Sequence, residues 1–178
     1  MSLNALDLNV LYPGLDEAEF VCEDKDAYAT RLACLLPNFP TSVVLQWFYD
    51  HPRCIETYAG LDYLSLRFEL VTLPAIFLDA ACFAGNETVL QFSDYMESAV
   101  GSSPRSARLL EYTRRNFTWP EPPVIADNRD GRFPPLPGFS WRVPYDIIEG
   151  HHRLAALYAL RLTAREGHKA WLVSSASS

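Results

Sequence analysis

Five consecutive residues combine a carboxylate, a glycine, two imidazoles and a guanidinium: Glu149, Gly150, His151, His152 and Arg153. The preceding run 145–149 is typical of a strand, and the run 154–160, rich in alanine and leucine, is typical of a helix. Glycine permits a positive φ and a close approach of backbone to a ligand, and the first N–H groups of a helix favour an anion. The guanidinium of Arg153 adds a planar fork that matches phosphate oxygens. The pattern therefore predicts a phosphate-binding turn.

Glu149 is the candidate catalytic residue of this turn. Beside a phosphate, a carboxylate can bind a nucleotide's metal ion or ribose, or accept a proton from a substrate hydroxyl. The alternative is that Glu149 pairs with Arg153 across the turn and only orients it. Strand alternation sends Asp146 to the opposite face from Glu149, so only Glu149 is expected to face the ligand.

The two histidines do not predict a metal site. Adjacent side chains at a helix start diverge by about 100°, so His151 and His152 cannot chelate one ion together without distortion. We expect His151 to line the pocket or to form structural hydrogen bonds with the preceding loop.

The segment 147–157, with its Ala155-Ala156 pair, resembles the ParB/sulfiredoxin-like superfamily. Members of that superfamily carry a Gly-x-x-Arg or Gly-Cys-His-Arg turn between a strand and an alanine-rich helix. The resemblance covers the last third of the chain. It implies a nucleotide site in which Gly150, His152 and Arg153 hold phosphate, with His152 donating a hydrogen bond.

One position departs from the sulfiredoxin pattern. His151 stands where sulfiredoxin has the cysteine that acts as its nucleophile. The resemblance therefore implies that the phosphate-binding half of the turn is retained and the redox half is lost, so that the chain is not a sulfiredoxin.

Composition predicts a soluble cytoplasmic protein with a proper core. Hydrophobic residues make up 49% of the 178 positions, which excludes disorder as the dominant state. The start of the chain lacks the basic and apolar regions of a secretory signal, and the most apolar stretch, 70–84, is too short to span a bilayer. The four cysteines are widely spaced, which favours reduced thiols.

Charge is unevenly distributed along the chain. Residues 1–100 carry 4 Lys and Arg against 15 Asp and Glu, whereas residues 101–178 carry 11 against 7. The acidic half repels a phosphate backbone, and the arginines of 105–115 are best explained as a solvated helix face. Nucleic acid is therefore a possible partner but not the favoured one.

Periodicity predicts an α/β (α+β) fold with a small mixed sheet. Period-3.6 patterns predict helices at 25–36, 42–49 and 87–98, and Ser103-Pro104 predicts the start of a helix that runs to Asn116. Four strands are expected, of which 64–71 alternates most clearly: 64–71, 124–126, 145–149 and 169–173. We predict an N-terminal helical extension over 1–60, packed on a ParB/sulfiredoxin-like domain over 61–178.

A proline-rich loop, 127–142, directly precedes the strand that delivers Gly150. Long irregular loops are often lids or binding segments, and this one is expected to cover or flank the phosphate site. Its aromatics Phe133 and Trp141 look exposed, whereas Trp47 and Tyr58 are expected in the core. His168, before the last strand, is expected at the surface.

The leading functional hypothesis is binding of a nucleotide or other phosphorylated ligand at Gly150, with magnesium accompanying the nucleotide where a cofactor is used. If the protein is an enzyme, magnesium-dependent phosphoryl transfer or nucleotide hydrolysis fits best, by analogy of fold. One alternative is a nonenzymatic interaction module that keeps the turn structurally, with its acidic half engaging a basic partner. Another is a ParB-like nuclease.

Overall fold

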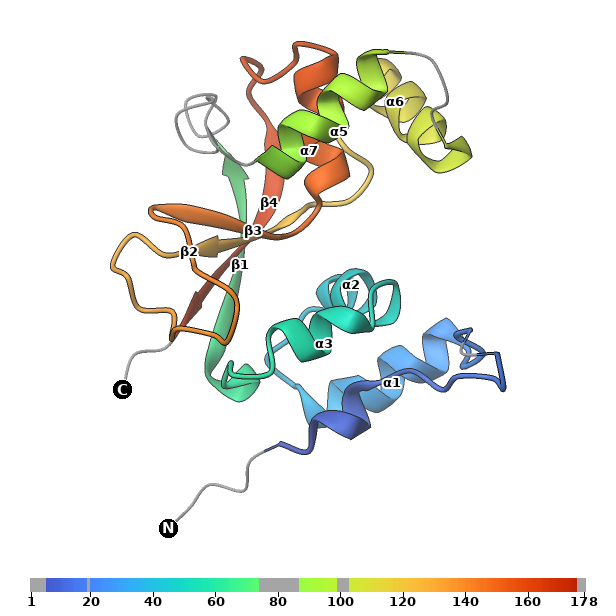
Figure 1. The fold of residues 1–178 in the computed structure, drawn as a ribbon, viewed down its shortest axis with the longest axis vertical. Coiled ribbons are helices and arrows are strands. Elements are labelled where there is room, and N and C mark those ends of the chain that lie inside the picture. The colour runs from blue at the N-terminus through green and yellow to red at the C-terminus, as the bar shows by residue number, and fades with distance from the viewer. Residues whose placement is uncertain (1–5, 19, 74–86, 99–102, 176–178) are drawn as a thin grey trace. The chain divides into compact units, whose positions relative to one another are not determined.

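The computed structural model describes residues 6–18, 20–73, 87–98 and 103–175. Within these residues the protein is mixed α/β, with a four-stranded sheet and six helices (Figure 1). The helices are α1 (Lys25–Leu35), α2 (Thr41–Val44), α3 (Arg53–Thr57), α5 (Glu87–Glu97), α6 (Pro104–Asn116) and α7 (His151–Ala159). The strands are β1 (Leu66–Leu73), β2 (Val124–Asp127), β3 (Tyr145–Glu149) and β4 (His168–Ser175). The predicted α/β class and its mixed sheet are confirmed.

The sheet has the strand order β1-β4-β2-β3, so that β2 is an inner strand. It pairs antiparallel with β3, where Val124 lies opposite Glu149, and parallel with β4, where Val124 lies opposite Trp171. Both partners of β2 come later in the chain than β2 itself. The register consequently places Pro123, just before β2, beside Gly150, just after β3.

Contacts divide the chain into two compact units. The first comprises residues 1–68, 132–141 and 174–178, and the second comprises 69–131 and 142–173. The predicted domain boundary between residues 60 and 61 stays a prediction.

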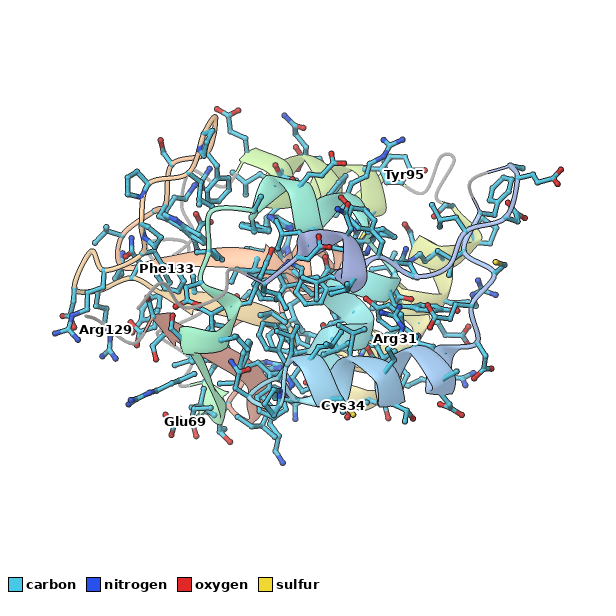
Figure 2. The ribbon with its side chains drawn as sticks, turned by 90° about the horizontal axis from the view of Figure 1, so that it is seen from below. Arg31, Cys34, Glu69, Tyr95, Arg129 and Phe133 are labelled. Atoms are coloured by element: carbon cyan, nitrogen blue, oxygen red, sulfur yellow. The ribbon has the colours of Figure 1, made fainter. Side chains whose placement is uncertain are left out.

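Aromatic side chains fill the first unit. Trp47 stacks on Phe48 with a ring separation of 5.2 Å, and Tyr58 stacks on Trp141 at 5.6 Å. Phe133, labelled in Figure 2, comes from the segment 132–141. Its ring contacts that of Trp141, and the residue is only 6% exposed. The expectation that Phe133 is exposed is therefore wrong, because residues 132–141 pack with the N-terminal residues of their own unit. Trp47 and Tyr58 are buried as expected.

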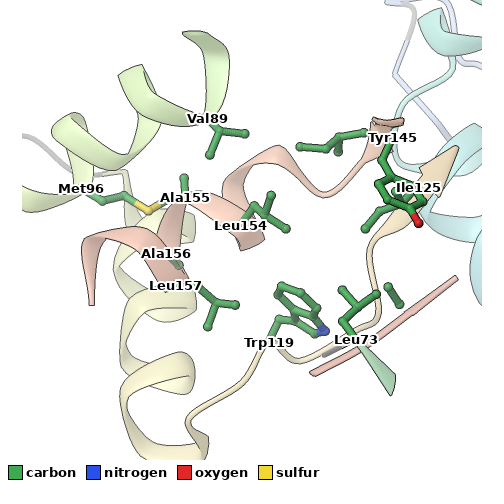
Figure 3. Close-up of a cluster of buried hydrophobic side chains, with 12 residues drawn as sticks. Leu73, Val89, Met96, Trp119, Ile125, Tyr145, Leu154, Ala155, Ala156 and Leu157 are labelled. Atoms are coloured by element: carbon green, nitrogen blue, oxygen red, sulfur yellow. The ribbon is translucent and has the colours of Figure 1, made fainter. Parts of the chain in front are cut away.

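The core of the second unit lies between the sheet and the helices α5 and α7 (Figure 3). Its side chains come from every element around it: Leu73, Val89, Met96, Trp119, Ile125, Tyr145, Ile147, Leu154, Ala155, Ala156, Leu157 and Ala170. Ala155 and Ala156 are fully buried, and their small side chains let α7 approach its neighbours closely. This packing fixes the direction in which the first turn of α7 points.

The helix starts follow local signals. Asp24 accepts hydrogen bonds from the N–H groups of Asp26 and Ala27 at the start of α1, and Ser103 accepts one from Ser106 with Pro104 in the first turn of α6. The predicted helix 42–49 begins at Thr41 and changes to π geometry over Leu45–Tyr49.

The predicted alternation along β1 is partly wrong. Leu64 lies in a 3₁₀ turn before the strand and is 50% exposed, and Leu70 is 45% exposed. Leu66 and Leu73 are the buried ends of the strand. The strand β1 passes from the first unit into the second after Phe68. Its two halves therefore belong to different units, and the side chains of one face do not all pack into the same core.

His168 is buried, at 1% exposed, so the surface prediction for it is wrong. Its Nδ1 lies 3.1 Å from Thr118 Oγ1, its Nε2 lies 3.3 Å from the Leu162 carbonyl oxygen, and its ring lies against Trp119. Burial lowers the pKa of His168 below its ordinary value of 6.5, because the charged imidazolium loses hydration there.

We expect His168 to make stability depend on pH. Its pKa is lower in the folded than in the unfolded chain, so the unfolded chain binds more protons as pH falls below about 6.5. The free energy of unfolding should therefore drop in that window, and should drop less in His168→Gln. Denaturant titrations between pH 8 and about pH 5 measure this. Equal slopes for wild type and His168→Gln would refute the assignment.

Candidate functional site

The predicted turn lies entirely within the second unit, between β3 and α7. Gly150 is the N-cap of α7 with φ of 109°, and its carbonyl oxygen accepts the hydrogen bond from Leu154 N–H that begins the helix. A glycine supplies no capping side chain, so the first turn of α7 has no side-chain cap from Gly150. The predicted strand, turn and helix are confirmed as local structure.

Only glycine fits at position 150. A Cβ there would lie 2.5 Å from Pro123 Cβ and 3.1 Å from Pro123 Cα. Pro123 is held in place because its carbonyl oxygen accepts a hydrogen bond from Trp171 N–H at 2.9 Å. The positive φ and this close approach both require the absence of a side chain.

Arg153 is buried, at 9% exposed, and its guanidinium contacts two acidic residues. Its Nη2 donates to Glu149 Oε1 at 3.2 Å. Its Nη1 donates to the Glu121 carbonyl oxygen at 3.3 Å and lies 3.8 Å from Glu121 Oε2. The Glu149 side chain is 17% exposed and that of Glu121 is 60% exposed. The Arg153–Glu121 pair is therefore more open to water than the Arg153–Glu149 pair.

The alternative in which Glu149 pairs with Arg153 is thus the arrangement present in the structure. The Glu149 carboxylate is therefore engaged by the guanidinium and not turned toward an open site. Catalysis by Glu149 stays a prediction. Asp146 is buried and accepts from the N–H groups of Arg142 and Ile147; desolvation raises its pKa above the ordinary value. It takes a structural position in the sheet.

The two histidines have different surroundings. His152 is exposed, and its ring stacks on that of Phe92 from α5 with the centroids 3.9 Å apart and the planes within 17°. His151 is half-buried. In the described residues there is no group of three or more His, Cys, Asp or Glu side chains that could hold a metal ion.

Three residues near the turn were not predicted from the sequence: Glu121, Pro123 and Phe92. Glu121 and Pro123 precede β2 and reach the turn through strand pairing, and Phe92 reaches it through the packing of α5 on α7. The only local signal for these residues was the proline cluster before β2. It predicts an extended backbone there, but it does not predict that this backbone lies beside the Gly150 turn.

None of the helices in the described residues has the length and apolar character that a membrane crossing requires.

Replacement of Gly150 by alanine should destabilise the fold strongly. The positive φ alone costs about 1 to 3 kcal/mol for a residue with a side chain, and the contact with Pro123 adds to it. Gly167→Ala is the matched control, because Gly167 has φ of 95° and nothing lies within 4 Å of the place that its Cβ would take. We expect Gly150→Ala to lose at least about 1 kcal/mol more than Gly167→Ala in urea unfolding, the usual minimum for overpacking. Equal losses would show that Pro123 can move aside.

Comparisons with protein-family models, with curated proteins and with solved structures found no match. The resemblance of residues 147–157 to the ParB/sulfiredoxin-like superfamily therefore stays a prediction.

Proposed function

We propose that the Gly150 turn binds a nucleotide or another phosphorylated small molecule. The observation that carries the proposal is the join of β3 to α7 through a glycine at positive φ, with Arg153 in the first helical turn. Helix N-termini favour anions through their N–H groups and dipole. Arg153 Nε lies 3.1 Å from where a Gly150 Cβ would be, so the guanidinium stem folds back over the turn.

The ion pairs of Arg153 are compatible with this function. Glu149 holds one edge of the guanidinium in a fixed direction, as a preorganising partner does. The exposed Glu121 carboxylate, at 3.8 Å, is the partner that an incoming phosphate would displace. His152, exposed on the first turn of α7, would donate the further hydrogen bond that the resemblance implies.

A magnesium ion would have to arrive with the nucleotide. Magnesium is commonly bound by one or two carboxylates together with substrate phosphates. The turn offers two carboxylates, those of Glu121 and Glu149. Glu121 is the better placed of these, because Arg153 engages Glu149 at closer range. When bound, the ion would neutralise phosphate charge.

A second function is favoured by one specific observation, the burial of Arg153 against Glu149. In this alternative the turn is structural, and the chain is a nonenzymatic interaction module whose acidic residues engage a basic partner. The two functions differ in what a nucleotide does to the folded protein.

ATP, CTP or pyrophosphate should raise the melting temperature of the wild type. A ligand at about 100 times its Kd adds about 2.7 kcal/mol, which corresponds to about 5 to 10 °C for a chain of this size. Arg153→Ala should abolish the rise and also destabilise the apo protein by about 1 to 3 kcal/mol, because the half-buried Glu149 carboxylate would lose its guanidinium partner. If no phosphorylated ligand moves the wild-type melting temperature, the interaction-module function is supported instead.

Glu121→Gln tests the site without a risk to folding. In EDTA it should tighten binding of ATP or CTP about two- to fivefold, since it removes an exposed carboxylate that competes for Arg153. With magnesium present, Glu121→Gln should lose the increase in ATP or CTP affinity that magnesium gives the wild type. Glu111→Gln is the matched control, because the Glu111 side chain is 58% exposed and pairs with Arg115 on α6. If the two variants bind ATP or CTP identically in calorimetric titrations, Glu121 is not part of the site.

A further inference from the structure

A cavity of about 520 Å³ lies at the other end of α7 from the Gly150 turn. Residues of α5, of α6 and of the C-terminal end of α7 line it: Met96, Glu97, Ala107, Leu110, Arg114, Ala159, Leu160 and Arg161. All of them belong to the second unit. The volume falls in the range of small-molecule sites, about 300 to 1,000 Å³. None of these residues takes part in the proposed phosphate site.

Three charged side chains from three elements line this cavity. Glu97 is the last residue of α5, Arg114 lies in the last turn of α6, and Arg161 follows the C-cap of α7. None of the three side chains forms an ion pair or a hydrogen bond with another residue in the described ranges. One carboxylate and two guanidinium groups are thus available to a ligand that carries both signs of charge.

Arg161 occupies a backbone position that favours glycine. Its φ is 54°, in the left-handed region. Its N–H donates to the Tyr158 carbonyl oxygen, and Leu162 N–H donates to the Leu157 carbonyl oxygen at 2.9 Å, which is the Schellman arrangement at a helix end. Glycine is the usual residue there because it has no Cβ. An arginine at such a strained position, with its side chain lining a cavity, points to a use for that side chain.

The three charged side chains are exposed, and the remaining residues of this open pocket are apolar. Leu110 and Leu160, both half-buried, supply hydrophobic surface, and Ala107 and Ala159 are short enough to keep the space open. The C-terminal ends of α5 and α7 bring partial negative charge, which adds to that of Glu97. A purely anionic ligand would meet this negative side of the cavity, so the lining favours a ligand with a cationic group as well.

We propose that this cavity binds a small zwitterion with an apolar side chain, which is the chemistry of an aliphatic α-amino acid. The carboxylate pairs with Arg114 and Arg161, the ammonium pairs with Glu97, and the side chain lies against Leu110 and Leu160. Guanidinium groups suit carboxylates because two parallel N–H groups match the two oxygens.

The test titrates L-leucine into the full chain and follows binding by ligand-observed saturation-transfer NMR. Two analogues each lack one charge: 4-methylpentanoate has no ammonium, and 3-methylbutylamine has no carboxylate. We expect leucine to bind saturably and each analogue to bind at least about tenfold more weakly, the usual loss for one charged hydrogen-bonded contact. Absence of saturable leucine binding, or equal binding of leucine and 4-methylpentanoate, would overturn the proposal.

Variants locate the binding to the cavity. Arg161→Gly should weaken leucine binding at least about tenfold while it raises the melting temperature, because glycine relieves the left-handed strain; binding lost in a more stable protein cannot be ascribed to unfolding. Arg114→Gln should also weaken binding, and Glu97→Gln should remove the preference for leucine over 4-methylpentanoate. Arg108→Gln is the matched control, since Arg108 is an exposed arginine of α6 that does not line the cavity. The proposal fails if Arg108→Gln weakens binding as much as Arg114→Gln, or if Arg161→Gly binds leucine like the wild type.

Discussion

The hydrogen bonds of the Arg153 guanidinium are the interactions on which the second unit of this protein depends. The guanidinium belongs to the first turn of α7, it donates to the Glu149 carboxylate at the end of β3, and it donates to the Glu121 carbonyl oxygen in the segment before β2. Three parts of the chain are therefore tied at one point. A buried cation needs such partners, because without them its desolvation would not be offset.

The glycine beside this cation sets the geometry of the join. Gly150 turns the chain from β3 into α7 at a positive φ, and Pro123 packs against the space that a side chain would occupy. The pairing of β2 with β3 on one side and β4 on the other holds Pro123 at that place. The direction of α7 is thus set at its start by backbone contacts and along its length by the burial of Ala155 and Ala156.

The two ends of α7 consequently have different chemistry. The N-terminal end carries the Arg153 guanidinium, which pairs with Glu149 and lies 3.8 Å from the exposed Glu121 carboxylate. The C-terminal end lines a cavity with Glu97, Arg114 and Arg161, which suits a ligand with both charges. Between these two ends, the middle of this short helix is buried.

The sequence by itself determined the local elements, because their signals act over a few residues: Ser103 and Pro104 start α6, and Gly150 separates β3 from α7. It also indicated that Glu149 and Arg153, four residues apart on either side of Gly150, are able to pair across the turn. Only the tertiary structure decided that Glu121 and Pro123 complete the turn, that His168 is buried against Trp119, and that Leu70 is exposed. These depend on strand register and on which surfaces pack together, and both arise from contacts between residues far apart in the chain that no local pattern records.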